Sequence, residues 1–471
     1  MSGPFGSSQW MYASGGFYDF PISNSLRFED GDSAYLNRTP SASNRRTWTW
    51  SGWVKRSTII TSNQNCFFGA WADDNNRFKM NFYQDKIEVV HVSGGTSYNF
   101  KITQLFRDVS AWYHIVLAVD TTQGTDTNRY KIYINGEQVT AFDNVAYPAQ
   151  NFDGAVNSAI EHTHGESDGS ANYLDGYLAE VNFIDGTALT PASFGELKND
   201  IWIPKNTSGL TFGSQGFRLQ FKQSGTGTAS SSTIGADTSG NTNHWTSNNL
   251  VASDVVLDSP TNNFATLNPL HRNSATASNN PILTEGATVH TSTLADYWQT
   301  SIATIGVTSG KWYFEAKIQD SNTTLVAVGM GDEGDIQTWG VGNGYLGAGK
   351  SLSYGSGSSA YTHSNIIGIA VDVDNGKVYW AKDNTYINSG NPAGNANGTA
   401  IPTGGVSNGT YFLGVSGYKL NGHAVLQVNF GGYHANSLSS AATDANGYGT
   451  FEYAPPTGYY ALCTKNLAEY G

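Results

Sequence analysis

The densest set of side chains able to bind a metal lies in one short polar stretch. His162, His164, Glu166 and Asp168 each stand two positions from the next. Imidazole and carboxylate groups at this spacing can share a transition-metal ion such as zinc. The spacing fixes no further ligand. A polar loop open to solvent, or a contact that responds to pH through the histidines, explains the same residues.

Three acidic turns carry carboxylates close enough in sequence to hold a hard cation such as calcium. They are Asp30 with Asp32, Asp120 with Asp126, and Asp372 with Asp374. Spacing alone assembles no set of six oxygen ligands at any of them. For Asp374, which precedes Asn-Gly, the alternative is a hairpin turn in which its carboxylate accepts backbone hydrogen bonds. We therefore expect no cofactor beyond a structural calcium ion, which the sequence permits without requiring.

The sequence contains no motif that indicates catalysis. His-Glu-x-x-His and Cys-x-x-Cys are both missing, and the short glycine-based patterns that do occur carry no information in a chain with 54 glycines. Residues 332–335 (Asp-Glu-Gly-Asp) form the nearest acidic cluster, but they follow an apolar run and border glycine, which is typical of a solvated turn. We expect a protein that binds or builds and is not an enzyme.

The tryptophans fall into two groups according to their neighbours. Strand-like runs, where core packing is expected, contain Trp48, Trp50, Trp53, Trp112, Trp312 and Trp380. Loop-like sequence rich in Asn, Asp, Gln and Thr contains Trp71, Trp245, Trp298 and Trp339. An exposed indole beside amide and carboxylate groups suits the face of a sugar ring. It suits a protein interface equally well, since tryptophan is enriched there, and partly buried packing is a further alternative.

Short strands joined by tight turns are the elements that would position these residues. Gly (54), Tyr (26), Phe (22) and Trp (12) are plentiful, and charged residues make up only 13%. Residues 47–54 (TWTWSGWV) alternate bulky and small side chains, and Asn135-Gly136 divides residues 130–142 into a hairpin. One short helix is expected after Thr190. Further strands are expected at residues 112–120, 174–184, 311–318, 325–331, 366–374, 377–382 and 411–416.

Composition divides the chain into four parts. They are an aromatic N-terminal arm (1–24), a first sandwich (25–222), a linker rich in Ser, Thr, Gly and Asn (223–262) and a second sandwich (263–471). The predicted fold is therefore all-β, with two tandem β-sandwiches. The arm is too small for a core of its own, so we expect it to dock on a partner, with a disordered tail as the alternative. Its anchoring side chains would be Trp10, Met11, Tyr12, Phe17, Tyr18 and Phe20.

Charge and the N-terminus argue against several partners. The net charge is −13 and no run of five basic residues occurs, which argues against nucleic acid and anionic membranes. No apolar stretch of about 18 residues and no leader-like N-terminus is present, so neither a membrane span nor a signal peptide is expected. Cys66 and Cys463 lie far apart, so we expect free thiols and folding in a reducing cytoplasm.

Motifs of the first half occur in the order found in concanavalin A-like lectin/glucanase, or laminin-G-like, domains. Residues 25–56 resemble the opening of such a domain, and WYHIVLAVD, YKIYINGEQV and YLDGYLAEVNFIDGTALTPASFGE follow. This version resembles virion proteins of tailed phages, notably marine ones, over residues 7–262, including DSPTNNF. The resemblance implies a jelly-roll sandwich. Glucanases of this fold carry Glu-x-Asp-x-x-Glu on one strand, and its absence here argues against a glycosidase.

The second half resembles a SPRY-like sandwich. The residues that carry this resemblance are GKWYFEAKI, VAVGMG and IIGIAVDVDNGKVYWAKDN, and the ending YAPPTGYYALCTKNL is similar to the close of the same phage proteins. This implies a second, bent two-sheet sandwich.

Together the resemblances imply a structural protein of a tailed-phage virion, made in the host cytoplasm. A fibre, knob or decoration protein would adsorb to the host surface through outward sandwiches, and its arm would bind other capsid or tail proteins. A homo-oligomer is expected, with a trimer as a reasonable form. One alternative is a carbohydrate-binding adhesin that recognises host polysaccharide. A glycan hydrolase is a further alternative, which needs two carboxylates about 5–10 Å apart in a cleft.

Overall fold

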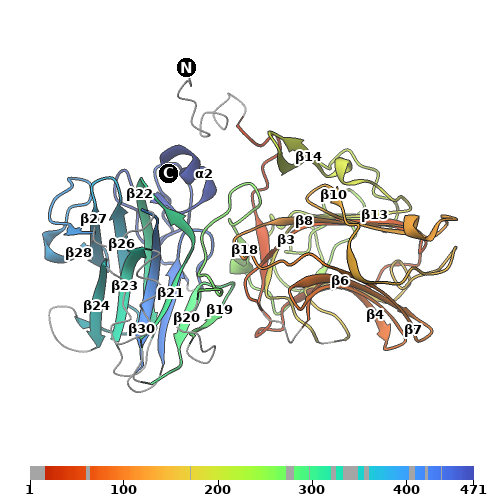
Figure 1. The fold of residues 1–471 in the computed structure, drawn as a ribbon, viewed down its shortest axis with the longest axis horizontal. Helices are drawn as coiled ribbons and strands as arrows, with labels where there is room; N and C mark the ends of the chain where they lie inside the picture. The colour runs from red at the N-terminus through yellow and green to blue at the C-terminus, as the bar shows by residue number, and fades with distance from the viewer. Residues whose placement is uncertain are drawn as a thin grey trace. The chain divides into compact units, whose positions relative to one another are not determined.

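The computed structural model describes two compact all-β units, as the sequence predicts (Figure 1). The first ends at Thr261 and the second begins at Asn262. The described residues are 16–59, 64–169, 171–271, 280–295, 298–319, 325–332, 348–354, 360–401, 409–419, 423–435 and 437–471. Among them, no helix is long and apolar enough to cross a membrane.

The first domain is a sandwich of two eight-stranded sheets, which we call sheets A and B and which form two layers in Figure 1. Sheet A has the order β10 (Glu137–Gln138), β9 (Tyr130–Ile134), β8 (Tyr113–Asp120), β3 (Thr47–Arg56), β13 (Gly176–Asp185), β1 (Ser25–Phe28) and β18 (Val255–Val256), with β16 (Phe217–Leu219) paired to β13. Sheet B has the order β11 (Phe142–Val145), β7 (Thr96–Ile102), β6 (Lys86–Ser93), β5 (Asn76–Tyr83), β4 (Asn65–Asp73), β12 (Glu161–His164), β2 (Tyr35–Arg38) and β17 (Thr246–Asn248). A separate pair consists of β14 (Gly195–Lys198) and β15 (Ile201–Pro204), and single 3-10 turns cover Asp126–Asn128, Pro191–Ser193 and Ala252–Asp254.

Alternation along the strands decides which side chains enter this core. Trp48 and Trp50 on β3 are fully buried between the sheets, and Trp50 stacks on Phe68 of β4. Trp53, an odd number of positions away, lies on the other face of sheet A. The predicted hairpin is confirmed at Asn135-Gly136, where both residues have positive φ (48° and 86°).

The outer face of sheet A is partly covered by the chain's own segments. The described part of the arm packs there: Phe17 is buried, and Phe20 and Ile22 join Trp53 in one apolar cluster. Lys198 lies over the Phe17 ring at 5.8 Å. These arm residues are therefore part of the first domain, which differs from the prediction that they dock on a partner.

The segment predicted as a linker, residues 223–262, also belongs to the first domain, almost to its end. Its strands β17 and β18 extend sheets B and A. Trp245 and Ile234 are buried in the core. The carboxylate of Asp237 accepts hydrogen bonds from the backbone of Arg218 at 2.9 Å and Asn243 at 2.8 Å. Composition failed here because a few apolar side chains and one carboxylate order a long polar segment.

The predicted helix after Thr190 is shorter than expected. Pro191–Ser193 form one 3-10 turn, and the Thr190 side chain makes no capping hydrogen bond. The backbone turns instead into the β14–β15 pair.

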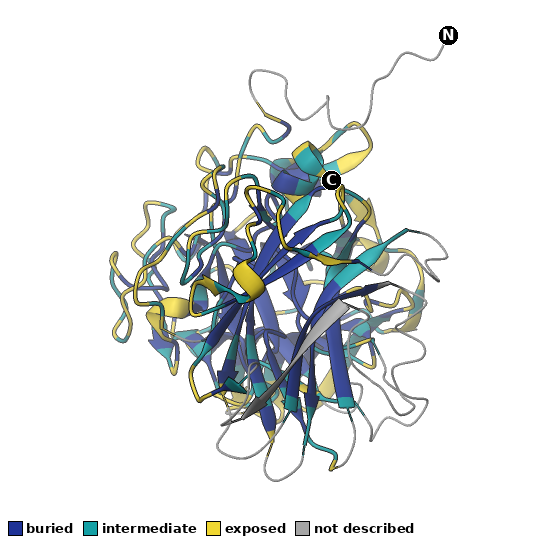
Figure 2. Ribbon diagram, turned by 90° about the vertical axis from the view of Figure 1, so that its left-hand side faces the viewer, coloured by how far each residue is buried: buried dark blue, intermediate teal, exposed yellow. Residues whose placement is uncertain are grey.

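The second domain is also a sandwich of two sheets, named sheets C and D, whose described strands are mostly buried (Figure 2). Trp312 and Phe314 on β22 lie in the core between them. Sheet C has the order β19 (Ile282–Thr284), β20 (Val289–Ser292), β31 (Ala424–Asn429), β22 (Lys311–Gln319), β26 (Ile366–Asp372), β27 (Lys377–Lys382) and β28 (Thr385–Tyr386), with β29 (Thr399–Ala400) on β27 and β32 (Tyr460–Ala461) on β22. Sheet D has the order β21 (Trp298–Val307), β30 (Tyr411–Tyr418), β23 (Leu325–Asp332), β24 (Ala348–Tyr354) and β25 (Ala360–Tyr361). A 3-10 turn covers Ile387–Ser389, and helix α2 (Thr464–Tyr470) follows β32.

Both cysteines are free, as predicted, and the structure shows that both are buried. Burial raises the pKa of the Cys66 and Cys463 thiols to about 12, so neither is an ionised nucleophile at neutral pH.

Candidate functional site

The four residues of the predicted metal site do not come together. His162 and His164 on β12 point into the core and are 4% and 0% exposed. Asp168 lies on the outer face of sheet B, where Lys79 pairs with it at 2.8 Å. Glu166 is also buried, at 2% exposure. The described residues therefore do not form this metal site, and the histidines are not in a solvated loop either.

The two histidines serve the core as neutral groups. His162 donates from Nδ1 to the carbonyl of Ile160 at 2.9 Å and accepts at Nε2 from the backbone of Asn157 at 3.0 Å. His164 accepts at Nε2 from the indole of Trp50 at 3.4 Å. Burial lowers the pKa of His162 to about 4 and that of His164 to about 3. Both imidazoles are therefore uncharged near neutral pH.

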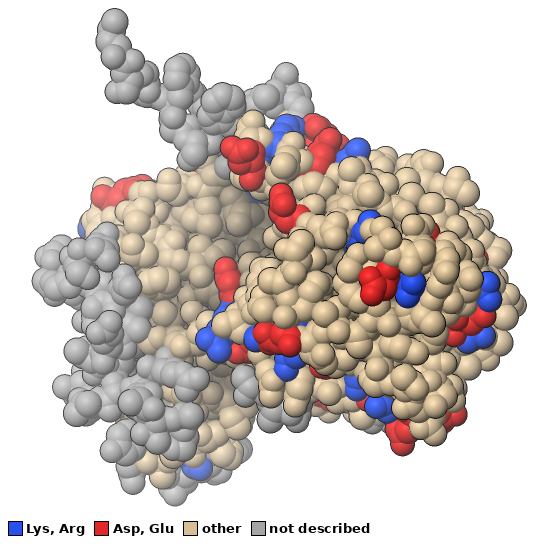
Figure 3. Space-filling model, turned by 45° about the vertical axis from the view of Figure 1, so that its right-hand side comes forward, with Lys and Arg blue, Asp and Glu red and all other residues tan. Residues whose placement is uncertain are grey.

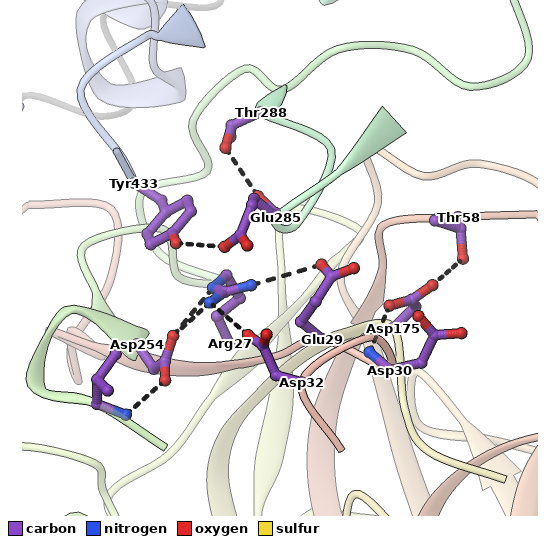
Figure 4. Close-up of polar contacts among 11 residues, drawn as sticks. Arg27, Glu29, Asp30, Asp32, Thr58, Asp175, Asp254, Glu285, Thr288 and Tyr433 are labelled. Atoms are coloured by element: carbon purple, nitrogen blue, oxygen red, sulfur yellow. Dashed lines mark hydrogen bonds and ion pairs between the residues drawn. The ribbon is translucent and has the colours of Figure 1, made fainter. Parts of the chain in front are cut away.

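An acidic cluster is found instead at the end of β1 (Figure 4). Glu29, Asp30 and Asp175 bring carboxylate oxygens within 4.8 Å of one another. Asp30 and Asp175 are 145 positions apart and meet because β1 pairs with β13 antiparallel, which places the end of β1 beside the start of β13. Among the described residues, this is the group whose acidic ligand atoms gather closely enough to hold a metal ion.

Arg27 neutralises one side of this cluster. Its guanidinium donates to Asp254 from Nε (3.1 Å) and Nη2 (2.6 Å), and Nη1 lies 3.5 Å from Glu29. Asp32 lies 3.9 Å from Nη2 (Figure 4). The predicted Asp30–Asp32 pair is therefore divided, with Asp32 facing Arg27 and Asp30 facing Asp175.

The surroundings of Asp175 raise the pKa of its carboxyl group. Burial raises its pKa to about 6, and the neighbouring Asp30 carboxylate adds to the rise. Hydrogen bonds from the Asp30 backbone (2.9 Å) and the Thr58 hydroxyl (3.0 Å) oppose it. A proton and a hard divalent cation would compete for these oxygens, so Glu29, Asp30 and Asp175 are the residues that fit a calcium ion.

The acidic turn of the second domain has a structural explanation. Asp372 pairs with Lys311 at 2.9 Å and accepts from the backbone and the amide of Asn375, both at 2.9 Å. Asp374 accepts from the backbone of Gly310 at 2.8 Å. These bonds fix the β26–β27 hairpin, which was the alternative to a calcium site.

The four candidate ligand-binding tryptophans have different surroundings. Trp245 is 1% exposed and its ring centroid lies 4.5 Å from that of His164, so it is a packing residue and the prediction of a glycan or partner contact is wrong. Trp298 begins β21 and packs against Tyr418 at 5.6 Å. Trp339 lies outside the described residues. Trp71 is half-buried on β4.

Trp71 lies in a mixed aromatic and charged surface on the outer face of sheet B. The Arg77 guanidinium, on the paired strand β5, is 5.7 Å from its ring centroid. Asp168 lies 3.8 Å from Arg77 and accepts from Lys79 and Asn172 at 2.8 and 3.0 Å. We call these five residues the Trp71 surface. It combines an indole with donors and acceptors already fixed in place.

Elsewhere charge is sparse. On the face drawn in Figure 3, Lys and Arg are scattered among Asp and Glu and form no basic patch among the atoms described there. The expectation that nucleic acid is not a ligand stays a prediction.

Residues 29–193 match the family model described as the Concanavalin A-like lectin/glucanases superfamily. This stretch is a concanavalin A-like, laminin G-like domain. It covers about a third of the chain and lies within the first sandwich. No curated protein matches the chain significantly.

Solved structures resemble parts of the chain at low identity. Mouse laminin alpha1 domains LG4-5 are 8% identical, with 93% of this chain and 96% of that chain covered and a TM-score of 0.29. The tailspike protein 2 enzymatically active domain of bacteriophage CBA120 is 14% identical, with 36% and 26% covered and a TM-score of 0.28. The SPRY domain of human HERC1 is 14% identical, with 32% and 92% covered and a TM-score of 0.22. At these TM-scores the likenesses carry no argument about function.

Sequence reasoning missed most of the acidic cluster. Arg27, Glu29, Asp175 and Asp254 belong to no local motif, and Arg27 and Asp254 are 227 positions apart. The one available signal was the acidic turn after β1, which supplies Asp30.

Proposed function

We propose that this chain is a structural protein of a tailed-phage particle that presents its two sandwiches to the host surface and does not catalyse. The ordered motifs of residues 7–262, similar to virion proteins of tailed phages, support this proposal. The lectin-type domain at residues 29–193 supports a role in surface binding. A fibre, knob or decoration protein that assembles as a homo-oligomer with other virion proteins fits both.

The observation that carries the binding part of the proposal is the Trp71 surface. An indole face beside a guanidinium, an ammonium, a carboxylate and an amide can contact the C–H face of a sugar while its hydroxyls form hydrogen bonds. Trp71, Arg77 and Lys79 are on strands β4 and β5, so these groups are held more rigidly than they would be on a loop. Recognition of a host surface glycan is therefore the second function that we propose.

Attachment to the particle is assigned to the first part of the arm. Phe17 and Phe20 pack on the first domain, so they are not available as anchors. Trp10, Met11 and Tyr12 lie outside the described residues and remain the proposed anchor.

Virions assembled in the presence of a chain that lacks residues 1–15 test the anchor. We expect the shortened protein to fold but to be absent from purified particles. A matched deletion of residues 1–24 should also destabilise the first domain, because it removes Phe17, Phe20 and Ile22. Retention of the shortened protein on particles would place the anchor on a sandwich face.

Binding of the purified full chain to host cells tests recognition. Trp71→Ala should reduce binding at least tenfold without changing the fold. Trp298→Ala, a matched loss of a half-buried indole in the second domain, should leave binding unchanged. Equal binding by wild type and Trp71→Ala would contradict the role of the Trp71 surface.

A further inference from the structure

A cleft of about 250 Å³ opens on the outer face of sheet A, away from the acidic cluster and the Trp71 surface. Ala118 of β8 and Lys131 and Tyr133 of β9 line it from the sheet. Their neighbours Leu117, Val119 and Ile132 point into the core, so alternation directs the lining side chains outward. The end of β8 and two loops complete the cleft, with Asp120 followed by Gln123 and Asn128 on one side and Ala188, Leu189 and Thr190 on the other.

The first loop is held in one conformation by its own side chains. Asp120 accepts from the Thr122 backbone and hydroxyl (3.1 and 2.6 Å) and from the Gln123 amide (2.5 Å). Arg129 donates to the carbonyls of Gln123, Gly124 and Pro148 at 2.6–2.9 Å. Partial burial by itself would raise the pKa of Asp120, but the donated hydrogen bonds hold it below its ordinary value. The Asp120 carboxylate is therefore ionised at neutral pH.

The second loop is fixed to the sheet by a buried hydroxyl. Thr49 on β3 is 0% exposed; it donates to the Thr187 carbonyl and accepts from the Leu189 backbone, both at 2.8 Å. Leu189 and Tyr133 pack on an apolar cluster beneath the loop. Both walls are therefore formed before a ligand arrives, which lowers the entropic cost of binding.

The groups that line the cleft differ in charge and remain apart. Among the described residues, the Lys131 ammonium has no ion pair and the Asn128 side-chain amide has no hydrogen-bond partner. Asp120 keeps capacity on Oδ2, which accepts one bond. Ala118, Leu189 and the Tyr133 ring add apolar surface. The cleft thus offers a cation, an anion and an amide around an apolar floor.

We infer that this cleft binds an acidic saccharide unit, whose carboxylate pairs with Lys131 and whose hydroxyls bond to Asp120 and Asn128. The ring would rest on Tyr133 and Leu189. A neutral sugar would remove water from the Lys131 ammonium without pairing its charge, and this desolvation costs free energy. The carboxylate of an acidic sugar would compensate for that cost by forming an ion pair. The volume suits one or two sugar units rather than a protein segment. This inference rests on the proposed role in surface binding and names the class of glycan.

Calorimetric titration of the purified full chain with trigalacturonate tests the inference. Maltotriose serves as the neutral sugar and sodium sulfate as an anion without a ring. We expect trigalacturonate to bind, maltotriose to bind at least tenfold more weakly, and sulfate not to displace trigalacturonate at equal concentration. Raising the salt concentration should weaken trigalacturonate binding, because an ion pair contributes to it.

Variants locate the binding. Lys131→Gln keeps most of the side-chain length and should weaken trigalacturonate binding at least tenfold. The control Lys101→Gln, which changes a lysine on sheet B, should leave that binding unchanged. Asn128→Ala should weaken this binding several-fold.

The inference would be overturned by any of three results: no trigalacturonate binding by folded wild type, unchanged binding by Lys131→Gln, or displacement by sulfate. Host-cell binding that persists without trigalacturonate binding would reject the cleft and leave the proposed function standing. Absence of the chain from particles would contradict the proposed virion role and would have no bearing on the result of the titration.

Discussion

The two sandwiches bury ionisable groups in different proportions. In the first domain four imidazoles are buried, and burial lowers the pKa of His91, His114 and His164 to about 3 and that of His162 to about 4. In the second domain burial raises the pKa of Glu315 to about 7. The second domain also contains His290 and His271, with pKa values lowered to about 3 and 4 by burial.

This difference matters because the two kinds of group respond to acid in opposite directions. An imidazole whose pKa falls on folding contributes fully above about pH 6.5, and its contribution is lost as pH falls toward the folded pKa. A carboxyl whose pKa rises on folding contributes most below about pH 4.5 and loses that contribution as pH rises through about 7. Similar folds can therefore differ in acid stability through a few core side chains.

The largest expected effect is acid unfolding of the first domain before the second. At pH 5 each buried imidazole costs about 2 kcal/mol, and the first domain has four of them. Asp175, with its raised pKa, offsets part of this, as Glu315 does in the second domain. Hydrogen exchange measured by mass spectrometry from pH 7 to pH 4 should show first-domain peptides losing protection first. If both domains lost protection at the same pH, the two domains would not differ in acid stability.

Loss of one core indole should affect the first domain more than loss of a half-buried one affects the second. Trp245→Ala removes a side chain packed on His164 and Phe217 and should cost about 3–5 kcal/mol. Trp298→Ala should cost about 1 kcal/mol. Denaturant unfolding, with peptides of each domain followed by hydrogen exchange, measures both. Equal costs would mean that Trp245 is not a core residue.

Glu315→Ala should change how the second domain responds to pH. Glu315 accepts from the backbones of Glu452 and Tyr453, both at 2.8 Å, so the variant loses stability at every pH. It also loses the gain that protonation of Glu315 gives in acid. The destabilisation should therefore be about 2 kcal/mol larger at pH 5 than at pH 7. A pH-independent difference in the unfolding free energy would contradict the raised pKa.

The smallest effect is expected at the acidic cluster of the first domain. Asp30→Asn removes one of three close carboxylates and, in the presence of chelator, should stabilise that domain by about 1 kcal/mol above pH 6. The thermal midpoint of the second domain should not change. If calcium stabilises wild type but not the variant, the cluster holds a cation. If the variant is less stable than wild type in chelator, repulsion among the three carboxylates does not destabilise the domain.

Local patterns determined the elements of this protein. The alternation in residues 47–54, the Asn135-Gly136 turn and the apolar runs predicted β3, β8, the β9–β10 hairpin, β13 and five strands of the second sandwich, because side-chain period and turn geometry act over a few residues. The strands of sheet B were not predicted. The all-β fold and the burial of Trp48 and Trp50 followed from the same patterns.

Only the tertiary structure decided which polar residues meet. His162 and Asp168 are near in sequence but lie on opposite faces of sheet B. Asp30 and Asp175 are far apart in sequence but touch across β1 and β13. Strand pairing brings together residues whose separation no local rule specifies, and burial then sets their charge state. The packing of residues 223–262 and of Phe17 had the same cause, since contacts with distant strands outweighed local composition.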